Sequence, residues 1–529
     1  MEITRKNFAE EYENIVNNLK LSCFVGFDAE FTALLSGDYF KNRLFDTNEE
    51  RYDKMKTKVD KMMMLQVGLT MFHYDRVNDD YNAIGYTFHL CPQSVGDIDQ
   101  SFMFQASTLK FLCRHNFNFN KFTYEGIPYL SKLEEDEVHQ QIKNNNLARY
   151  LNSNLEIKED NQLQHYCSEV SKWLSNSEDG TMYIDEHDAI LRYLIHTEVR
   201  ERFPNVLTTD SLGNSNKILI YRNEHIKGAN NISIDILEKK LLKSLLGFSQ
   251  IIHLLAQEGK PLVGHNVFMD LVLLHNQFIG PLPKKYSKFK YNINSMFPVI
   301  YDTKYISYEM ARKLTFDELW SSNTLQELYE FFAEAKCEKL QTGINFVRLI
   351  GQSNMNKSYH EAGWDSFCTG YCFVRLGHWA ACENIGKQRP VAPAEMLAAL
   401  EPYCNKVNVI RGALPYMSLT GSDPPTHRPS ILHVKSLKER YIDVEKVAYE
   451  VAGLGAADVR SHGSRAALIA AGTRFTADKI MNKFRDSRNY KISMYKAYRH
   501  SAAHRIAIWS GALITGGLLL MLLHKRVKP

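Results

Sequence analysis

Asp28 and Glu30 are the first residues of the chain whose types and spacing fit metal chemistry. They stand two positions apart in the apolar segment CFVGFDAEF, residues 23–31, so their side chains would emerge on one face of a β-strand. Carboxylates this close repel each other, and a divalent cation such as Mg²⁺, which prefers carboxylate oxygens, would relieve the repulsion. Exposed strands also carry such pairs without metal, so the motif needs partners.

Three further residues supply those partners. Asp270 lies one turn into a predicted helix that follows PLVGHN, where it could equally interact with the positive end of the helix dipole. His360 is predicted just before another helix, and Asp365 lies in the first turns of that helix. An Asp-x-Glu strand, a helical Asp and a His-x4-Asp pair, in this order, match the DEDDh exonuclease pattern.

This pattern predicts a catalytic site with two metal ions. Carboxylates can hold two Mg²⁺ ions about 3.5 to 4 Å apart, which orient the attacking water and stabilise the leaving oxygen. The expected metal ligands are Asp28, Glu30, Asp270 and Asp365. His360 is the expected general base, because histidine titrates near neutral pH and can take a proton from the water.

The elements that must position these residues alternate between strands and helices. Strands are predicted at residues 23–31, 64–73 and 86–90, and further along the chain a helix at 234–258, a strand at 261–266 and a helix at 267–278. We therefore expect an α/β fold, a DEDD (RNase H-like) exonuclease core, formed by residues 1–150 and 230–413.

Two more modules and a linker are predicted. Residues 155–228 interrupt the core with a helix at 186–203 and a strand at 217–221. A proline-rich linker at 414–430 precedes residues 430–500, whose order is strand, helix, two strands, helix, strand. That βαββαβ order is typical of an RNA recognition motif. The first and third strands carry no aromatic residue to stack on bases, so a role in packing or dimerisation is the alternative.

Composition and charge exclude several classes of protein. With 44% hydrophobic and 23% charged residues, the 529-residue chain has the composition of a folded protein rather than a disordered or fibrous one. Its nine cysteines include no CxxC pair, which favours a reducing compartment. We interpret Cys368 and Cys372 as buried hydrophobic residues. The formal net charge is +4, with an acidic body and a basic segment from Arg474 onward.

An apolar segment near the C-terminus predicts a membrane anchor. Residues 506–523 are uncharged and mostly apolar, with basic residues on both sides. Such a segment is typical of a transmembrane helix, and the alternative is a buried helix. We expect a tail anchor in the mitochondrial outer membrane, or else in the endoplasmic reticulum, with the body in the cytosol.

A basic run with interleaved aromatic residues follows QFIGPLP. It begins with Lys284 and Lys285 and continues to Tyr291. Lysines with aromatic neighbours suit a single-stranded backbone and its stacked bases, so we expect RNA contact here; a solvated loop is the alternative.

Several segments resemble the poly(A)-specific ribonuclease family over residues 1 to about 440. They include FDAEF, GIPYL, PLVGHNVFMD, YDTK and HEAGWDSFCTG. Within that family the chain is similar to the membrane-anchored branch that shortens the 3′ ends of piRNA precursors. The resemblance implies hydrolysis of single-stranded RNA from 3′ to 5′ with release of 5′-mononucleotides.

The resemblance also implies residue roles and partners. Phe31, Asn266 and Lys304 correspond to family positions near the bound RNA end. The inserted module resembles a small nucleic-acid-binding module with an Arg and a His three residues apart, here Arg192 and His196. A PIWI-type protein would present the piRNA precursor, with a Tudor-type scaffold protein as a further partner, and relatives form homodimers.

Three functions therefore compete. The first is a membrane-tethered, Mg²⁺-dependent exoribonuclease that trims piRNA precursors. The second is a deadenylase of messenger RNA. The third is a catalytically inactive membrane scaffold that binds RNA, against which the five intact catalytic residues argue.

Overall fold

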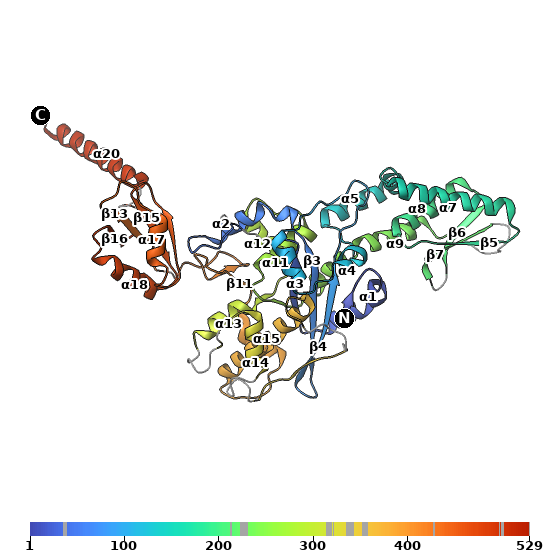
Figure 1. Cartoon of the computed structure of the whole chain (residues 1–529), viewed down its shortest axis with the longest axis horizontal. Coiled ribbons are helices and arrows are strands. Elements are labelled where there is room, and N and C mark those ends of the chain that lie inside the picture. The colour runs from blue at the N-terminus through green and yellow to red at the C-terminus, as the bar shows by residue number, and fades with distance from the viewer. Residues whose placement is uncertain are drawn as a thin grey trace. The chain divides into compact units, whose positions relative to one another are not determined.

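The computed structural model divides into two compact units. The first comprises Met1–Leu35, Met55–Asn408 and Ser418–Gly421, and the second comprises Ser36–Lys54, Val409–Met417 and Ser422–Pro529. The structure describes residues 1–34, 37, 40–211, 214–222, 231–313, 320, 322–334, 343–351, 358–426, 429–496, 498 and 502–527. The predicted α/β core is present in the first unit (Figure 1).

A mixed seven-stranded sheet forms the centre of the first unit. Its strands run in the order β1-β4-β3-β2-β8-β9, with β10 also paired to β4. The middle strands β2, β3 and β4 are antiparallel, whereas β8 and β9 extend the sheet parallel to β2. The strands are β1 (Glu2–Ile3), β2 (Phe24–Phe31), β3 (Met64–Asp75), β4 (Asp80–His89), β8 (Leu262–Gly264), β9 (Ile300–Asp302) and β10 (Val347–Leu349).

Helix α15 (Ala362–Ile385) packs directly on this sheet because two glycines leave room for its backbone. A Cβ atom at Gly26 of β2 would lie 2.2 Å from the carbonyl oxygen of Ser366, and one at Gly68 of β3 would lie 1.8 Å from that of Ala362. Phe72 of β3 and Phe373 of α15 both pack on Phe24, with ring centroids 4.6 and 5.0 Å away. The glycines and this aromatic cluster together fix how close α15 lies to β2.

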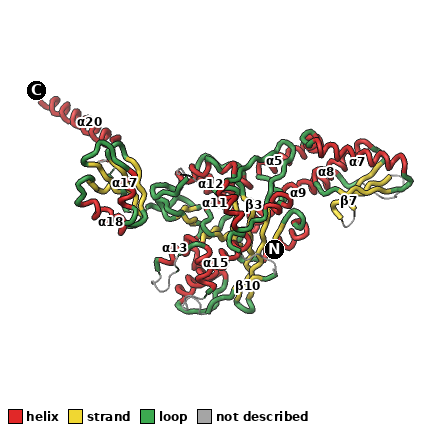
Figure 2. Tube along the Cα trace, viewed as in Figure 1, coloured by secondary structure: helices red, strands yellow, loops and turns green. Residues whose placement is uncertain are grey.

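Further helices of the first unit surround the sheet (Figure 2). They are α1 (Phe8–Leu21), α3 (Ala106–Arg114), α4 (Phe119–Glu125), α5 (Lys132–Lys143), α6 (Leu147–Asn152), α9 (Ile234–Leu246), α10 (Ser249–Glu258), α11 (Phe268–Leu274), α12 (Tyr286–Met296), α13 (Thr303–Ala311), α14 (Leu325–Ala333) and α16 (Pro393–Leu400). Two short strands, β11 (Lys406–Asn408) and β12 (Tyr416–Ser418), pair with each other.

The prediction of a single helix at residues 234–258 is wrong, because the helical segment is interrupted at Gly247 and forms α9 and α10 instead. Gly247 has φ +40°, and a Cβ atom there would lie 2.0 Å from the carbonyl oxygen of Pro128. The next amide, that of Phe248, donates to the same oxygen over 2.9 Å. Close packing against Pro128 therefore requires a glycine and a turn at residue 247, although the apolar periodicity of the sequence continues through this position.

The inserted module lies within the first unit. It consists of α7 (Ile157–Asn176), α8 (Ala189–Arg202) and a sheet of order β5-β7-β6, with β5 at Thr181–Asp185, β6 at Val206–Ser211 and β7 at Asn214–Arg222. One apolar cluster runs from Leu130 and Val138 of the core to Leu194 and Ile218 of the module. The module therefore shares buried side chains with the nuclease core.

The second unit contains the predicted βαββαβ order. Strands β13 (Leu432–Ser436), β14 (Ala457–Ser461), β15 (Ala466–Ala471) and β16 (Tyr490–Met494) form an antiparallel sheet of order β14-β15-β13-β16, with helices α17 (Val444–Val451) and α18 (Arg474–Arg485). Its assignment to the RNA recognition motifs stays a prediction.

A segment from early in the chain belongs to this second unit, which the sequence did not indicate. The amide of Leu44 donates to Asp458 of β14 over 2.5 Å, and the guanidinium of Arg460 lies 4.4 Å from the ring centroid of Phe45. The segment includes most of α2 (Asn48–Lys56). Residues 36–54 are therefore part of the C-terminal unit rather than of the nuclease core.

The expected membrane span needs a correction. Helix α20 (Ala502–Val527) covers the apolar segment. Among the residues that the structure describes, however, no helix is long and apolar enough to cross a bilayer. The described side chains of α20 end at residue 518, so the last part of the predicted span, 519–523, lies outside them.

Candidate active site

Strand β2 carries the first two catalytic candidates in the middle of the sheet. Asp28 pairs in register with Gly68 of β3, and Glu30 with Gln66. The register between the two strands shifts directly after Glu30, so Phe31 pairs with Met64 instead. Such irregularities re-aim side chains beside functional sites. Phe31, which is half-buried, therefore follows the carboxylates at a bend in the strand pairing.

Asp270 enters from the first turn of α11, and a turn stabilised by Asp302 leads into this helix. Asp302, fully buried at the end of β9, accepts hydrogen bonds from the amides of Asn266 at 2.9 Å and Val267 at 3.2 Å. The side chain of Asn408 donates to Asn266 Oδ1 over 2.9 Å. Asn266, at φ +64°, is thereby held in a left-handed conformation just before the helix.

A hydrogen bond from the backbone of His360 to the side chain of Asp365 joins these two residues at the start of α15. The amide of His360 donates to Asp365 Oδ2 over 2.9 Å, and His360 has φ +66°. A left-handed conformation is uncommon for a residue with a side chain, and it persists only where surrounding contacts impose it. The predicted His-x4-Asp pair is therefore one structural unit.

The structure brings the predicted carboxylates together. Metal-ligating atoms of Glu30, His360 and Asp365 lie within 4.8 Å of one another. Burial, followed by the negative charges of Asp365, Asp270 and Glu30, raises the pKa of Asp28 well above its ordinary value. The pKa of Asp270 and the pKa of Asp365 are each raised to about 7, and burial is the largest cause of both shifts. A cation would remove the mutual repulsion.

A second, independent observation indicates that these residues suit a divalent metal. Asp365 Oδ1 is buried and makes no hydrogen bond to any described residue, although a buried carboxylate oxygen ordinarily has a partner. Hard cations such as Mg²⁺ and Mn²⁺ bind oxygen ligands of this kind. Asp28, Glu30, Asp270 and Asp365 are therefore suited to hold the metal, and Asp365 Oδ1 has no hydrogen-bond partner in the part of the chain that the structure describes.

Phe111 of α3 and His115 at its C-cap contact His360, and sequence reasoning missed both. The ring of His115 lies edge-on to that of His360 with centroids 4.2 Å apart, and the ring of Phe111 lies 4.8 Å away. Burial and the neighbouring His115 lower the pKa of His360, which favours its neutral form, as a general base requires. Nothing in the local sequence around residue 115 indicates this contact.

Lys304, Lys284 and Lys285 lie in two places. Lys304 is in the first turn of α13, two residues after Asp302, and burial lowers its pKa. Lys284 and Lys285 are exposed at the start of α12. Of the aromatic residues predicted to stack on RNA there, Tyr286 and Phe289 are buried and only Tyr291 is exposed, so the stacking surface is smaller than expected.

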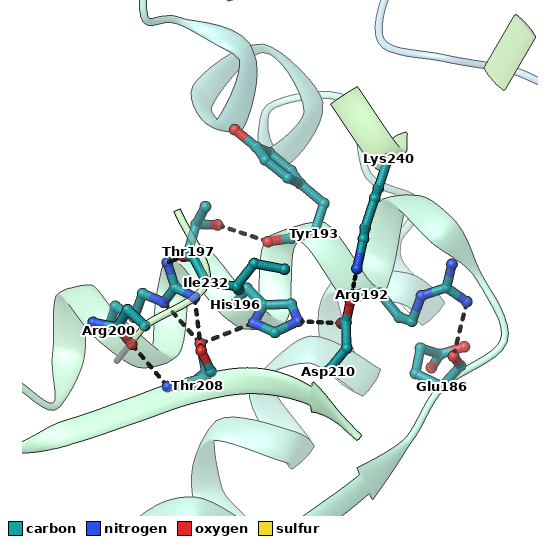
Figure 3. Close-up of polar contacts among 11 residues, drawn as sticks. Glu186, Arg192, Tyr193, His196, Thr197, Arg200, Thr208, Asp210, Ile232 and Lys240 are labelled. Atoms are coloured by element: carbon teal, nitrogen blue, oxygen red, sulfur yellow. Dashed lines mark hydrogen bonds and ion pairs between the residues drawn. The ribbon is translucent and has the colours of Figure 1, made fainter. Parts of the chain in front are cut away.

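Arg192 and His196 lie on α8, and their contacts indicate a structural role for the histidine (Figure 3). His196 is fully buried, with Nδ1 2.8 Å from Thr208 Oγ1 and Nε2 3.4 Å from Asp210 Oδ1. Nδ1 therefore connects α8 to β6, and Nε2 lies beside Asp210. Arg192 donates from Nη1 to the carbonyl oxygens of Glu186 at 3.3 Å and His187 at 3.2 Å.

Fold and site define a ribonuclease of the DEDD type. The chain belongs to the CAF1 ribonuclease family, whose family model matches residues 3–373. Nucleases of this type depend on divalent metal ions, in agreement with the donor set described above. All five predicted catalytic residues lie within the matched range.

Curated relatives extend the comparison over the whole chain. The chain is 59% identical over 528 residues to the pre-piRNA 3′-exonuclease trimmer of Bombyx mori, covering 100% of this chain and 99% of that protein. It is 29% identical over 516 residues to the poly(A)-specific ribonuclease PNLDC1 of Mus musculus, covering 96% of each. The human poly(A)-specific ribonuclease PARN is 28% identical and covers 83% of this chain and 71% of its own length. The resemblance to the poly(A)-specific ribonucleases is confirmed.

Among solved structures, Pop2p of S. pombe in its Mg²⁺- and Mn²⁺-bound form matches with a TM-score of 0.33 at 16% identity. That match covers 71% of this chain and 90% of the other.

Proposed function

We propose that this protein is a 3′-to-5′ exoribonuclease that trims the 3′ ends of piRNA precursors with the aid of two Mg²⁺ ions. The observation that carries the proposal is the cluster of Glu30, His360 and Asp365, with Asp365, Asp270 and Glu30 close enough to raise the pKa of Asp28. Beside it, the buried Oδ1 of Asp365 has no hydrogen-bond partner among the described residues. The choice of substrate rests on the 59% identity to a pre-piRNA 3′-exonuclease along the full chain.

Each residue has a distinct task in this chemistry. Metal ions bound by the carboxylates supply charge stabilisation for the scissile phosphate and a lowered pKa for the attacking water. His360, held neutral by burial and by His115, accepts the proton of that water at a ring nitrogen. Asn266 and Lys304, both bonded through their amides to Asp302, place an amide and an ammonium group beside the RNA end.

Partners follow from the same proposal. The substrate is single-stranded RNA presented by a PIWI-type protein, with a Tudor-type scaffold protein as a further partner, and the enzyme acts as a homodimer. Phe31 contacts the terminal nucleotide because it follows Glu30 at the bend of β2. Lys284 and Lys285 contact the phosphate backbone farther from the end, since both ammonium groups are exposed.

The cellular location is a separate proposal. We place the protein at the mitochondrial outer membrane, with the endoplasmic reticulum as the alternative. The support is the exposed apolar side chains of α20, which include Trp509 and Leu513, next to the basic segment before them. Fractionation of organelles tests it: we expect the protein to co-migrate with markers of the mitochondrial outer membrane, and recovery with markers of another compartment would contradict the proposal.

Labelled single-stranded RNA tests the central proposal. We expect stepwise shortening from the 3′ end with release of 5′-mononucleotides in Mg²⁺ and no cleavage in EDTA, because the carboxylates need the metal. A Glu30→Gln variant, of nearly the same shape, should be inactive yet still bind RNA. Strong preference for a poly(A) tail over a heteropolymeric 3′ end would instead favour the deadenylase. Binding without cleavage by the unaltered protein would favour the scaffold.

A further inference from the structure

Gln66 of β3 is a buried polar residue beside the catalytic candidates, and the proposed chemistry leaves it without a task. It pairs in register with Glu30 of β2. Side chains directly opposite each other on antiparallel strands lie on one face of the sheet, with their Cβ atoms about 4.5 to 5.5 Å apart. The side chain of Gln66 is enclosed, because only 3% of the residue is exposed. The sheet therefore holds a neutral amide next to a proposed metal ligand.

The oxygen of this side-chain amide has a fixed partner. The backbone amide of Ala362, at the start of α15, donates to Gln66 Oε1 over 2.9 Å. A backbone N–H can only donate, so the oxygen must face it, and this contact sets the orientation of the side-chain amide. Gln66 thereby joins the strand opposite Glu30 to the helix that carries Asp365.

The nitrogen of the same amide has no such partner. Gln66 Nε2 donates to no residue that the structure describes. A buried side-chain amide ordinarily uses its donors, because a donor removed from water without a partner costs free energy. An unused donor beside Glu30 therefore indicates a ligand that accepts a hydrogen bond there.

A second buried glutamine shows how a purely structural amide behaves in this fold. The backbone amide of Met64 donates to Gln277 Oε1 over 2.8 Å, and Gln277 Nε2 donates to the carbonyl oxygen of Met64 over 3.3 Å. Both polar atoms of Gln277 are thus used on one residue of β3. Gln66, by contrast, uses only its oxygen.

The surroundings of Gln66 decide which acceptor fits. Ligand atoms of Glu30, His360 and Asp365 lie within 4.8 Å of one another, so the group bound at this cluster is the phosphate that the proposed chemistry attacks. Hydrolysis places additional negative charge on the non-bridging oxygens of that phosphate. A neutral N–H directed at such an oxygen stabilises the charge as it develops.

We propose that Gln66 Nε2 donates a hydrogen bond to a non-bridging oxygen of the scissile phosphate, which makes Gln66 a further residue of the catalytic site. This inference rests on the proposed function, because it takes the carboxylate cluster as the place where RNA is cleaved. The hydrogen bond is stronger in the transition state than in the bound substrate, so it raises the cleavage rate more than the RNA affinity. Oε1 of the same residue holds the start of α15.

Single-turnover cleavage by the full chain in Mg²⁺ tests the donor. Gln66→Met, which has a similar length and no donor, should lower the cleavage rate by about 10² to 10³-fold with little change in RNA affinity. Gln66→Glu keeps an oxygen for the amide of Ala362 and should be slowed as well. Hydrogen exchange of the Ala362 amide in EDTA should show that this bond is retained. A Gln66→Glu enzyme as fast as the unaltered protein would show that only the bond to α15 matters and would overturn the proposal.

Phosphorothioate RNA identifies the acceptor. Sulfur accepts hydrogen bonds weakly, so the unaltered protein should cleave one of the two diastereomers at the last linkage more slowly, and Gln66→Met should lose that difference. Gln277→Met is the matched control, because it also removes a buried amide but one that bonds to Met64, and it should keep the difference. The same sulfur effects in all three proteins would overturn the phosphate contact.

Metal affinity separates this proposal from a role for Gln66 in orienting Glu30. Mn²⁺ titrated by calorimetry should bind Gln66→Met and the unaltered protein equally, and weaker binding to the variant would overturn the substrate contact. Failure of the unaltered protein to cleave RNA would refute the proposed function itself. Cleavage by the unaltered protein with equally fast Gln66 variants would refute only the role of Gln66.

Discussion

The backbone amide of His360 and the carboxylate of Asp365 are joined by a 2.9 Å hydrogen bond, so the proposed base and a metal ligand move as one unit. The bond exists because His360 adopts φ +66° immediately before α15. A substitution at 360 therefore has two separable effects, one on proton transfer and one on the position of Asp365.

His360→Asn should separate these two effects. Asparagine tolerates the left-handed conformation and keeps the amide bond to Asp365, but it cannot accept the proton as a base. We expect single-turnover cleavage to fall by about 10² to 10⁴-fold with unchanged Mn²⁺ affinity. His360→Val, which is strained at positive φ, should lose metal affinity as well, and equal metal affinity for both variants would contradict the proposed coupling.

The stability of the metal-free protein should depend on pH in a defined direction. Burial raises the pKa of Asp270 to about 7 from an ordinary value of 3.8, so between these values the folded state holds a proton that the unfolded chain releases. The free energy of unfolding should therefore fall as pH rises through this window and level off above it. Asp270→Asn removes the penalty and should stabilise the protein in EDTA at pH 8 by roughly 1 to 4 kcal/mol.

Urea unfolding at pH 4.5 and at pH 8 measures this difference. The stabilisation should be much smaller at pH 4.5, because this pH lies less than one unit above 3.8, where the unfolded chain begins to release the proton, so only a small part of the penalty has accumulated. Asp60→Asn, at an exposed position, is the control and should change stability little at either pH. Destabilisation by Asp270→Asn in EDTA at pH 8 would contradict the assigned burial penalty.

Gly68→Ala should disturb the site from a distance. Its Cβ would lie 1.8 Å from the carbonyl oxygen of Ala362, so α15 must shift away from β3 and carry Asp365 with it. We expect a loss of about 1 to 3 kcal/mol in stability, as for other overpacked cores, together with weaker metal binding. Gly453→Ala, where nothing lies within 4 Å of the added atom, is the matched control. A fully active Gly68→Ala enzyme would show that the contact does not position Asp365.

RNA with a 2′-O-methyl group on its last ribose should resist digestion. Phe31 and Asn266 are the residues expected beside the terminal nucleotide, and the methyl group removes a hydroxyl donor and adds bulk there. A displacement of about 1 Å of the scissile phosphate can cost 10²-fold in rate. Time courses on two oligonucleotides that differ only in this methyl group measure the effect. Equal rates would mean that the pocket does not sense the 2′ position and would remove a main reason to prefer a small-RNA trimmer.

The clustering of the candidate carboxylates could be predicted from the sequence because each lies in a short segment with its own periodicity. Asp28 and Glu30 share a strand face, and His360 and Asp365 span one helix start. His115 and Asp302 could not be assigned, since their roles depend on which distant segments pack beside them. His115 acts through a ring contact with a residue 245 positions later, and Asp302 through amides on three separate segments. Local patterns carry no signal for such pairings.

Residues 36–54 belong to the C-terminal unit, and this has a consequence for biosynthesis. The bond between Leu44 and Asp458 spans 414 positions, so at about 5 to 20 residues per second a ribosome needs tens of seconds to deliver its second partner. During that time Phe45, which lies between β2 and β3 in the sequence, has no β14 to pack against. The nascent enzyme therefore lacks these contacts until translation is nearly complete, and a chain that stops at the proline-rich linker would leave Leu44 and Phe45 permanently without them.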